Sequence, residues 1–172
     1  MTHHRSLLLP VLAVALSACA DAPTDAIVDG PDLAVVAPGH LVAGSGHVTT
    51  PAGTREFTFH AVERPDGSVG GSYKIVLPNG LFFEADVTCT AVETTTGWVG
   101  GVIRATNAAV VVVGSTSMFY VIDNGEGGNP ADVVSIAAFN QPEGADLEFC
   151  AERPLVLPQQ SVTEGNVQVR RA

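Results

Sequence analysis

From His40 onward, apolar and polar positions follow the pattern of short β-strands joined by tight turns. Runs rich in Val, Ile, Phe, Tyr and Thr are separated about every 10–15 residues by turns rich in Gly, Pro, Asn and Asp. No stretch keeps a sustained helical period of apolar residues. The pattern therefore predicts an all-β domain.

Two turns fix the expected pairing of the first strands. Residues 77–81 are Leu-Pro-Asn-Gly-Leu, with Pro where a type I turn needs its φ angle and Gly at the left-handed position. Residues 64–68, Arg-Pro-Asp-Gly-Ser, repeat this chemistry. Both segments predict a three-residue hairpin loop with a glycine bulge, which sets Leu77 opposite Leu81 and Arg64 opposite Ser68.

This register brings the large apolar side chains into cross-strand rows. One row is expected to hold Phe57, Ile75 and Phe83, and the next Phe59, Tyr73 and Ala85. All of them point to the same face, so the odd-numbered side chains between positions 57 and 87 are expected to form the dry interior.

The rest of the domain is expected to continue this antiparallel meander. Residues 93–97, Glu-Thr-Thr-Thr-Gly, look like a third such turn, which would set Val87 opposite Ile103 and Cys89 opposite Gly101. Two glycine pairs inside strands, at 70–71 and 100–101, suggest bulges or sharp bends. The further strands are expected at 110–113 or as one strand to 122, then at 133–139, 147–150 and 167–169. We therefore expect about eight antiparallel strands in a barrel or a sandwich, with the barrel favoured.

Cys89 and Cys150 are expected to form one disulfide. They are the two cysteines of the β-patterned region, and in an oxidising compartment two such cysteines most simply pair. They lie 61 residues apart, and the chain-entropy account gives such a bridge about 4 kcal/mol of stabilisation. Two buried free thiols, or a bond between two chains, remain as alternatives.

The N-terminus has the three parts of an export signal. A basic start with Arg5 is followed by a short apolar stretch from Leu7 to Leu16 and by small residues. The segment Leu16-Ser17-Ala18-Cys19 resembles the cleavage box of bacterial lipoprotein precursors at all four positions. The resemblance implies cleavage before Cys19 and a membrane anchor of two or three acyl chains at that residue. The alternative is an ordinary secretory signal that contains a cysteine.

These segments divide the chain into three parts. Residues 1–18 are expected to be the lipoprotein signal peptide, residues 19–38 a flexible tether, and residues 39–172 a single all-β domain. The tether carries three prolines and four aspartates, which favour extended and solvated chain. Its apolar patches at 27–28 and 33–36 could instead dock on the edge of the domain.

Charge and composition exclude several classes of protein. Without residues 1–18, the chain has seven Lys and Arg against 18 Asp and Glu, a net charge of −11. Such an acidic surface repels phosphate backbones, so nucleic-acid binding is not expected. Apolar residues make up 46% of the chain and charged residues 15%, which excludes disorder along its whole length.

One row on the outer face of the sheet has the residue types of a hydrolase. The register sets His60, Ser72, Asp86 and Arg104 side by side across four strands. A catalytic triad needs its histidine between the serine and the carboxylate, whereas here the serine is central and Asp86 lies beside Arg104. An Asp86–Arg104 ion pair and a Lys74–Glu84 ion pair are expected instead. No enzyme motif stands elsewhere in the chain, so an enzyme is not expected.

Two groups of residues raise the question of a metal. His47 and His60 are about three or four positions out of register on the first hairpin, too far apart to share a zinc ion without rearrangement. The glycine-rich loop at 123–132 offers the oxygen ligands that calcium prefers, from Asp123, Asn124, Glu126, Asn129 and Asp132. Its spacing does not match the EF-hand loop, and a plain acidic turn or a ligand-contact loop are the alternatives. No other cofactor is expected.

A second resemblance covers residues 46–169. Strands flanked by glycine, a Cys in mid-domain, Asp-Asn-Gly-Glu at 123–126, a late Cys and a closing Gly-Asn-Val-Gln-Val at 165–169 are similar to secreted bacterial β-domains without an assigned function. The resemblance supports the fold class and carries over no active residue.

The anchor, the tether and the rigid β scaffold together indicate a function. We expect a non-catalytic binding or interaction module of the bacterial cell envelope, held to the membrane through Cys19 and facing the periplasm or the outside. Its partner would be an unknown ligand or an envelope protein. The alternatives are a structural or adhesion component of the envelope and, after that, an enzyme of an unrecognised kind.

Overall fold

The computed structural model describes residues 39–126 and 130–171 of the chain. The signal peptide, the cleavage box with Cys19 and the tether, all expected within residues 1–38, lie outside this part, as does Asn129. Among the described residues, no helix is both long enough and apolar enough to span a membrane.

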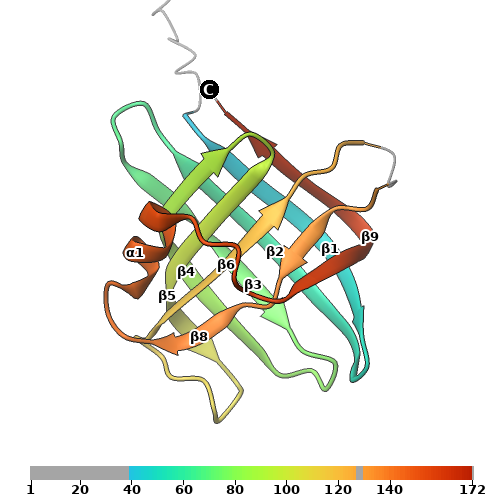
Figure 1. Cartoon of the computed structure of the whole chain (residues 1–172). Coiled ribbons are helices and arrows are strands. Elements are labelled where there is room, and N and C mark those ends of the chain that lie inside the picture. The colour runs from blue at the N-terminus through green and yellow to red at the C-terminus, as the bar shows by residue number, and fades with distance from the viewer. Residues whose placement is uncertain (1–38, 127–129, 172) are drawn as a thin grey trace, which may run out of the picture. The chain divides into compact units, whose positions relative to one another are not determined.

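The described residues form nine strands and one short helix (Figure 1). In chain order these are β1 (Leu41–Thr50), β2 (Gly53–Glu63), β3 (Val69–Val76), β4 (Phe82–Glu93), β5 (Thr96–Thr106), β6 (Thr116–Ile122), β7 (Val133–Ser135), β8 (Ala138–Gln141), α1 (Ala145–Glu152) and β9 (Gln159–Arg170).

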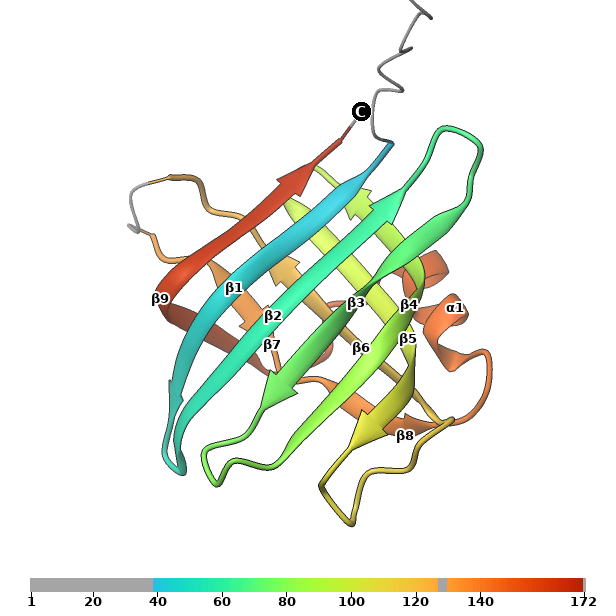
Figure 2. The same ribbon diagram turned by 180° about the vertical axis from the view of Figure 1, so that it is seen from behind.

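Eight of the strands close into an antiparallel barrel, as Figures 1 and 2 show. Strands β1 to β6 form an uninterrupted meander, and β7 and β9 complete the circle through the pairs β6–β7, β7–β9 and β9–β1. The short strand β8 is additional and pairs with β6. The all-β meander with about eight strands is confirmed, and of the two architectures expected the barrel is present.

The barrel has two distinct ends. At the terminal end, β1 begins and β9 finishes, with Leu41 paired to Arg170. At the far end lie the β1–β2 turn, the β3–β4 turn and the β5–β6 loop at 107–115 (Figure 2). The chain therefore enters the described domain at one end of the barrel and presents three of its connections at the other.

The two turns used to set the register behave as expected. The amide of Leu77 donates to the carbonyl of Leu81 over 2.7 Å. The amide of Arg64 donates to the carbonyl of Ser68 over 2.8 Å. The glycines of the loops, Gly67 and Gly80, have positive φ angles of 80° and 77°. Both cross-strand rows are therefore confirmed, with Phe57–Ile75–Phe83 in one and Phe59–Tyr73–Ala85 in the next.

Aromatic rings from opposite walls meet inside the barrel. The ring of Phe119 on β6 lies 5.3 Å from that of Phe59 on β2 and 5.1 Å from that of Tyr73 on β3, both edge-on. The apolar side chains of the two cross-strand rows are all buried, whereas Val69, Leu77 and Leu81, near the turns, are only partly buried. The middle of the barrel is thus filled by side chains.

The third turn differs from the expectation. Its loop has two residues, since Glu93 pairs with Thr96, and Thr94 takes a positive φ of 54°. The pairing of β4 with β5 then shifts between Val87 and Cys89, so that Val87 lies opposite Gly101 and Cys89 opposite Gly100. The predicted partners of Val87 and Cys89 were therefore wrong, because the shorter loop and a bulge at Thr88 change the register.

The bulge also changes the side of the barrel on which Cys89 lies. Val87 packs in the interior cluster, whereas Cys89 packs in a second cluster on the outer wall. There it forms the expected disulfide with Cys150, with a Cα–Cα distance of 6.2 Å. The disulfide is confirmed, but it lies outside the barrel.

Residues 147–150 form part of helix α1 and not the expected strand. Asp146, Phe149 and Cys150 are its buried residues, a spacing that matches one face of a helix, while Leu147 is exposed. Acidic residues in the first turn favour a helix at this place. Eight residues are too few to show a sustained helical period along the sequence.

Helix α1 and the segment that follows it cover the outer face of β4, β5 and β6. Trp98 donates its indole N–H to the carbonyl of Pro154 over 3.0 Å, and the hydroxyl of Tyr120 donates to that of Leu157 over 2.8 Å. Gly100 allows the helix to approach, because a Cβ there would lie 2.8 Å from the Cβ of Asp146.

The other glycine pair inside a strand, at 70–71, does not form the expected bulge. The pairing of β2 with β3 shows no register shift there, although Gly71 has a φ of 134°.

Three other expected strands have different bounds. Residues 110–113 belong to the β5–β6 loop, which Asn140 fastens by accepting from the amide of Val112 and donating to the carbonyl of Val110. The strand expected at 133–139 is divided into β7 and β8. The last strand begins at Gln159 and not at 167, because Val162 and Val167 are the buried apolar residues of a largely polar segment and alternation is weak there.

Candidate functional site

The acidic loop expected to hold calcium is fastened to the last strand by its own carboxylates. Asp132 accepts the amides of Asn124 and Val167, over 2.9 and 2.8 Å, one with each oxygen. Asp123 accepts the amides of Gly125 and Val169, both over 2.9 Å. Each carboxylate oxygen of the pair is thus already an acceptor for a backbone N–H.

This geometry does not form a metal site in the described part of the chain. Among those residues, no three or more His, Cys, Asp or Glu side chains come together as a metal site would require. Asn124 donates its side chain to the carbonyl of Ala131 over 2.7 Å, Glu126 is exposed, and Asn129 lies outside the described residues. Calcium at this loop stays a prediction, and no function is derived through it.

The polar row on the outer wall is close to the one expected. His60 lies opposite Ser72, and Ser72 opposite Asp86. Asp86 pairs with Val102 and not with Arg104, because of the shorter β4–β5 loop and the bulge at Thr88. The side chain of Arg104 nevertheless reaches Asp86, with 3.3 Å between guanidinium and carboxylate.

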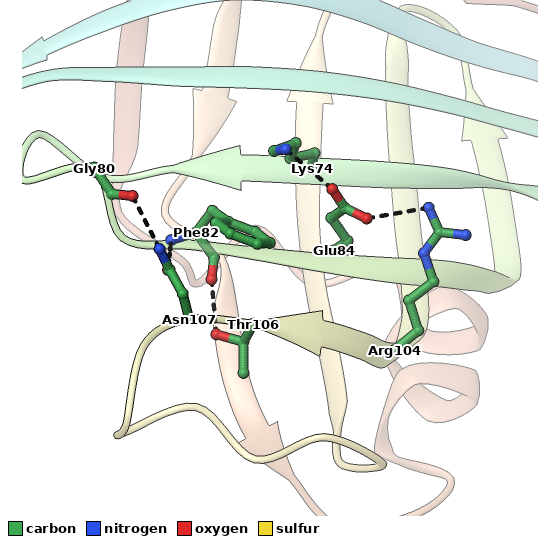
Figure 3. Close-up of polar contacts among 7 residues, drawn as sticks. All are labelled: Lys74, Gly80, Phe82, Glu84, Arg104, Thr106 and Asn107. Carbon is green, nitrogen blue, oxygen red and sulfur yellow. Dashed lines mark hydrogen bonds and ion pairs between the residues drawn. The ribbon is translucent and has the colours of Figure 1, made fainter.

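Glu84 is the centre of the ion pairs on this wall (Figure 3). One carboxylate oxygen lies 3.0 Å from the ammonium of Lys74 and the other 3.3 Å from the guanidinium of Arg104. The hydrogen bond from Lys74 and the two positive charges lower the pKa of Glu84. With Ser72 between His60 and Asp86, the row lacks the order that a catalytic triad needs.

Polar contacts next to these ion pairs hold β4 and β5 together at the far end. Asn107 accepts from the amide of Phe82 over 2.7 Å and donates to the carbonyl of Gly80 over 3.4 Å (Figure 3). Thr106 donates its hydroxyl to the carbonyl of Phe82 over 2.7 Å. These contacts anchor the beginning of the β5–β6 loop.

His47 lies apart from His60, as expected. It faces Glu56, while His60 faces Ala43. Its ring nitrogens lie 3.2 Å from the carboxylate of Glu164 and 3.7 Å from that of Glu56, at the protein surface. The two histidines do not share a site.

A recess of about 620 Å³ opens at the far end of the barrel. The β1–β2 and β3–β4 turns contribute to its walls, together with the connection from β7 to β8 and the start of β9. The side chains and backbone that line it come from Thr50, Pro51, Ala52, Arg55, Leu77, Pro78, Asn79, Ile136 and Gln160. None of these residues is acidic.

Arg55 is the one charged residue of this lining, and it is buried. It lies on the same face of β2 as Phe57 and Phe59, so its side chain is directed inward, and only 5% of the residue is exposed. Its Nη2 donates to the carbonyl of Ser135 over a long 3.4 Å. Burial lowers the pKa of the guanidinium, because removal from water disfavours the charge.

The guanidinium of Arg55 keeps most of its donors free. A guanidinium carries about five N–H donors, and this one makes a single hydrogen bond within the described residues. Its Nε has no partner there, and no carboxylate of the described residues lies within ion-pair distance. A buried charge without a counter-ion is costly for a protein, which makes this position a candidate binding site.

Gln160 adds a second unsatisfied group to the same recess. Its buried Oε1 accepts no hydrogen bond from the described residues. The walls around the two polar groups are largely apolar, from Leu77, Pro78 and Ile136. A few polar groups in an apolar concavity are the usual composition of a small-molecule site.

The sequence interpretation missed this site, although one signal for it is in the chain. Arg55 has the same odd parity as Phe57 and Phe59, so strand alternation alone sets it inward. Gln160 had no such signal, because the strand was expected to begin seven residues later.

Comparisons of this chain with protein-family models, with curated proteins and with solved structures found no match.

Proposed function

We propose that this chain is a lipoprotein of the bacterial cell envelope, anchored through Cys19, that acts as a non-catalytic binding module. The recess at the far end of the barrel is its ligand site. The observation that carries the proposal is Arg55, a buried guanidinium that lines an apolar recess and has one long hydrogen bond. A ligand that supplies acceptors there would offset the cost of its burial.

The recess lies at the end of the barrel opposite the start of β1. The carbonyl of His40, one residue before β1, accepts from the amide of Glu63 at the terminal end. The β1–β2 and β3–β4 turns, at the other end, form walls of the recess.

A non-catalytic function agrees with the groups that the described residues bring together. The row of His60, Ser72 and Asp86 has its serine in the centre, and Asp86 is in an ion pair with Arg104. The described lining of the recess contains a guanidinium, two side-chain amides and the hydroxyl of Thr50, which donates to the carbonyl of Gly53 over 2.8 Å, but no nucleophile paired with a base. The groups present therefore favour a binding function over a catalytic one.

The anchor is tested by fractionating bacterial cells that express the full chain. We expect the protein in the membrane fraction and labelled by an added fatty acid, whereas Cys19→Ala leaves the precursor without label. Ser17→Ala is the matched control, because alanine also fits a lipoprotein cleavage box. Equal labelling of the wild type and Cys19→Ala would overturn the anchoring part of the proposal.

The ligand site is tested by nuclear magnetic resonance on the full chain carrying Cys19→Ala. A library of small organic fragments is added to the ¹⁵N-labelled protein, and the amide shifts are followed. We expect the shifts to gather at Ala52, Asn79 and Ile136, which line the recess. Shifts confined to the outer row around Ser72, or no shifts with any fragment, would overturn the recess as the binding site.

A second candidate function rests on apolar side chains at the same end. Val110, Val112 and Val113 of the β5–β6 loop are 69, 56 and 57% exposed, and Phe139 of β8 is 38% exposed. Apolar groups gathered on a surface are typical of a protein contact, which favours a structural or adhesion role in the envelope. A photo-cross-linker at position 112 would then capture a persistent neighbour in intact cells, and one at Ser68, at the terminal end, would not.

A further inference from the structure

We propose that the ligand of the recess is an amphiphilic organic anion, with a carboxylate or phosphate head bound to Arg55 and an apolar body against the turns of the far end. This inference rests on the proposed function and specifies the chemical class of its ligand. Three features of the recess support this inference. They are the buried guanidinium of Arg55 without a counter-ion, the unsatisfied amide oxygen of Gln160, and the apolar walls.

The first feature is the contrast between Arg55 and Arg104. Arg104 is half-exposed on the outer wall and forms ion pairs with both Glu84 and Asp86, at 3.3 Å each. Arg55 is only 5% exposed and has no acidic partner among the described residues. The chain has a net charge of −10 and many acidic side chains, yet none of the described ones pairs with Arg55. The position of a counter-ion beside Arg55 is therefore open to an anionic ligand.

The shape of the guanidinium selects the head group. Its planar fork of N–H donors matches two oxygens of a carboxylate or a phosphate, and such charge-assisted pairs are the strong ones. The free Nε and the single bond of Nη2 to Ser135 leave donors for this arrangement. A neutral ligand could accept hydrogen bonds there but would not neutralise the charge.

Gln160 contributes a group that can adapt to the head. Its Oε1 would accept from a hydroxyl or an N–H next to the acidic group, and rotation of the amide by half a turn would present its N–H₂ to the anion itself. Asn79, in the exposed β3–β4 turn, already uses its Oδ1 to accept from the amide of Leu81 over 3.2 Å. Arg55 and Gln160 are therefore the two polar contacts expected for the ligand.

The walls limit the body of the ligand. Leu77, Pro78 and Ile136 give apolar contacts, and a recess of about 620 Å³ lies within the range of sites for small organic molecules. Phe57 and Ile75, each 2% exposed, form the next row inward and close the barrel interior. The body therefore lies in the mouth of the barrel and does not enter its middle.

The test compares three probes with the same tail in the full chain carrying Cys19→Ala, below the concentrations at which they form micelles. Decanoate and decyl phosphate carry the two anionic heads, and decanol is neutral. By calorimetry, we expect at least one anion to bind about tenfold more tightly than decanol, as a hydrogen bond to a charged group implies. The ranking of the two anions identifies which head the site prefers.

Variants at Arg55 separate charge from folding. Arg55→Gln should remove the preference for the anion while decanol binding persists, and Arg55→Lys should keep part of it. The matched control is Arg64→Gln, since Arg64 is exposed in the β2–β3 turn at the terminal end and contacts Ser68. This control should bind all three probes like the wild type.

Several results would overturn the inference. They are decanol binding as tightly as both anions, an anion preference that survives in Arg55→Gln, or no binding of any probe. In each of these cases the fragment experiment decides separately whether the recess binds another class of ligand. Failure of the anion inference is thus distinguished from failure of the proposed function.

Discussion

Cys89 of β4 is bonded to Cys150 of α1 on the outer wall of the barrel, across a Cα–Cα distance of 6.2 Å. The bond ties the helix to the strand that contains the bulge, and Phe149 and Trp98 pack in the same outer cluster. It therefore holds a layer that covers one side of the barrel, and the barrel closes through backbone pairing without it.

Replacing both cysteines should weaken the domain without opening the barrel. The bridge closes a loop of 61 residues, so we expect Cys89→Ala/Cys150→Ala to lower the free energy of unfolding by about 4 kcal/mol. Urea titration followed by fluorescence measures the loss. Hydrogen exchange should show that α1 loses protection first, while β1 to β3 keep theirs. Equal protection of α1 in the variant and the wild type would contradict this role.

Gly100 should tolerate no side chain. A Cβ at this position would lie 2.7 Å from the sulfur of Cys89 and 2.8 Å from the Cβ of Asp146, so Gly100→Ala forces α1 away from the barrel wall. We expect a loss of about 1–3 kcal/mol, the usual cost of overpacking. The matched control is Gly70→Ala in β3, whose nearest contact would be an ordinary 3.6 Å to Arg64. Its stability should change by less than about 0.5 kcal/mol.

The first hairpins could be predicted because their information is local. Each of the turns at 64–68 and 77–81 carries a Gly with the required positive φ, and alternation then orders the side chains on both sides. The same parity sets Arg55 inward, so half of the candidate site was present in the sequence. The other polar groups of the site, from Ser135 and Gln160, could not be found this way, because they belong to strands that are distant from Arg55 in sequence.

The bulge and the helix could not be predicted for a different reason. At Thr88 the chain gains one residue relative to its partner strand, and neither neighbour is a Gly or Pro that would mark the place. Phe149 and Cys150 have β-like composition, yet they form a helix because the outer wall of β4 and β5 offers them an apolar surface. Tertiary packing outweighs local propensity at this point.

Tyr73 should make the protein sensitive to alkali. Its hydroxyl is buried, donates to the carbonyl of Ser117 over 2.9 Å and also contacts the Ser117 hydroxyl. Burial raises the pKa of Tyr73 well above its usual value, so the folded state keeps the proton where the unfolded chain releases it. This contribution to stability is complete below about pH 10 and is lost as the pH rises further.

Tyr73→Phe tests both parts of that statement. At neutral pH we expect a loss of about 1–2 kcal/mol, because two groups of Ser117 lose their buried partner. Above about pH 10 the stability of the wild type should fall by up to about 1.4 kcal/mol per pH unit more steeply than that of the variant. Unfolding by urea at a series of pH values measures the two slopes. Parallel slopes would contradict the burial of an ionisable Tyr73.

Arg55 should cost the domain stability when no ligand is bound. A buried cation with one hydrogen bond of 3.4 Å is poorly compensated, and an apolar side chain of similar length fits among Leu77, Pro78 and Ile136. We therefore expect Arg55→Met to raise the free energy of unfolding by an amount on the order of 1 kcal/mol, since replacing buried charges by apolar groups is often stabilising. Arg64→Met, at an exposed turn, should leave stability unchanged within about 0.5 kcal/mol. Thermal and urea unfolding measure both. A loss of stability in Arg55→Met would mean that Arg55 supports the fold. The burial of its charge without a counter-ion would then no longer indicate a ligand site.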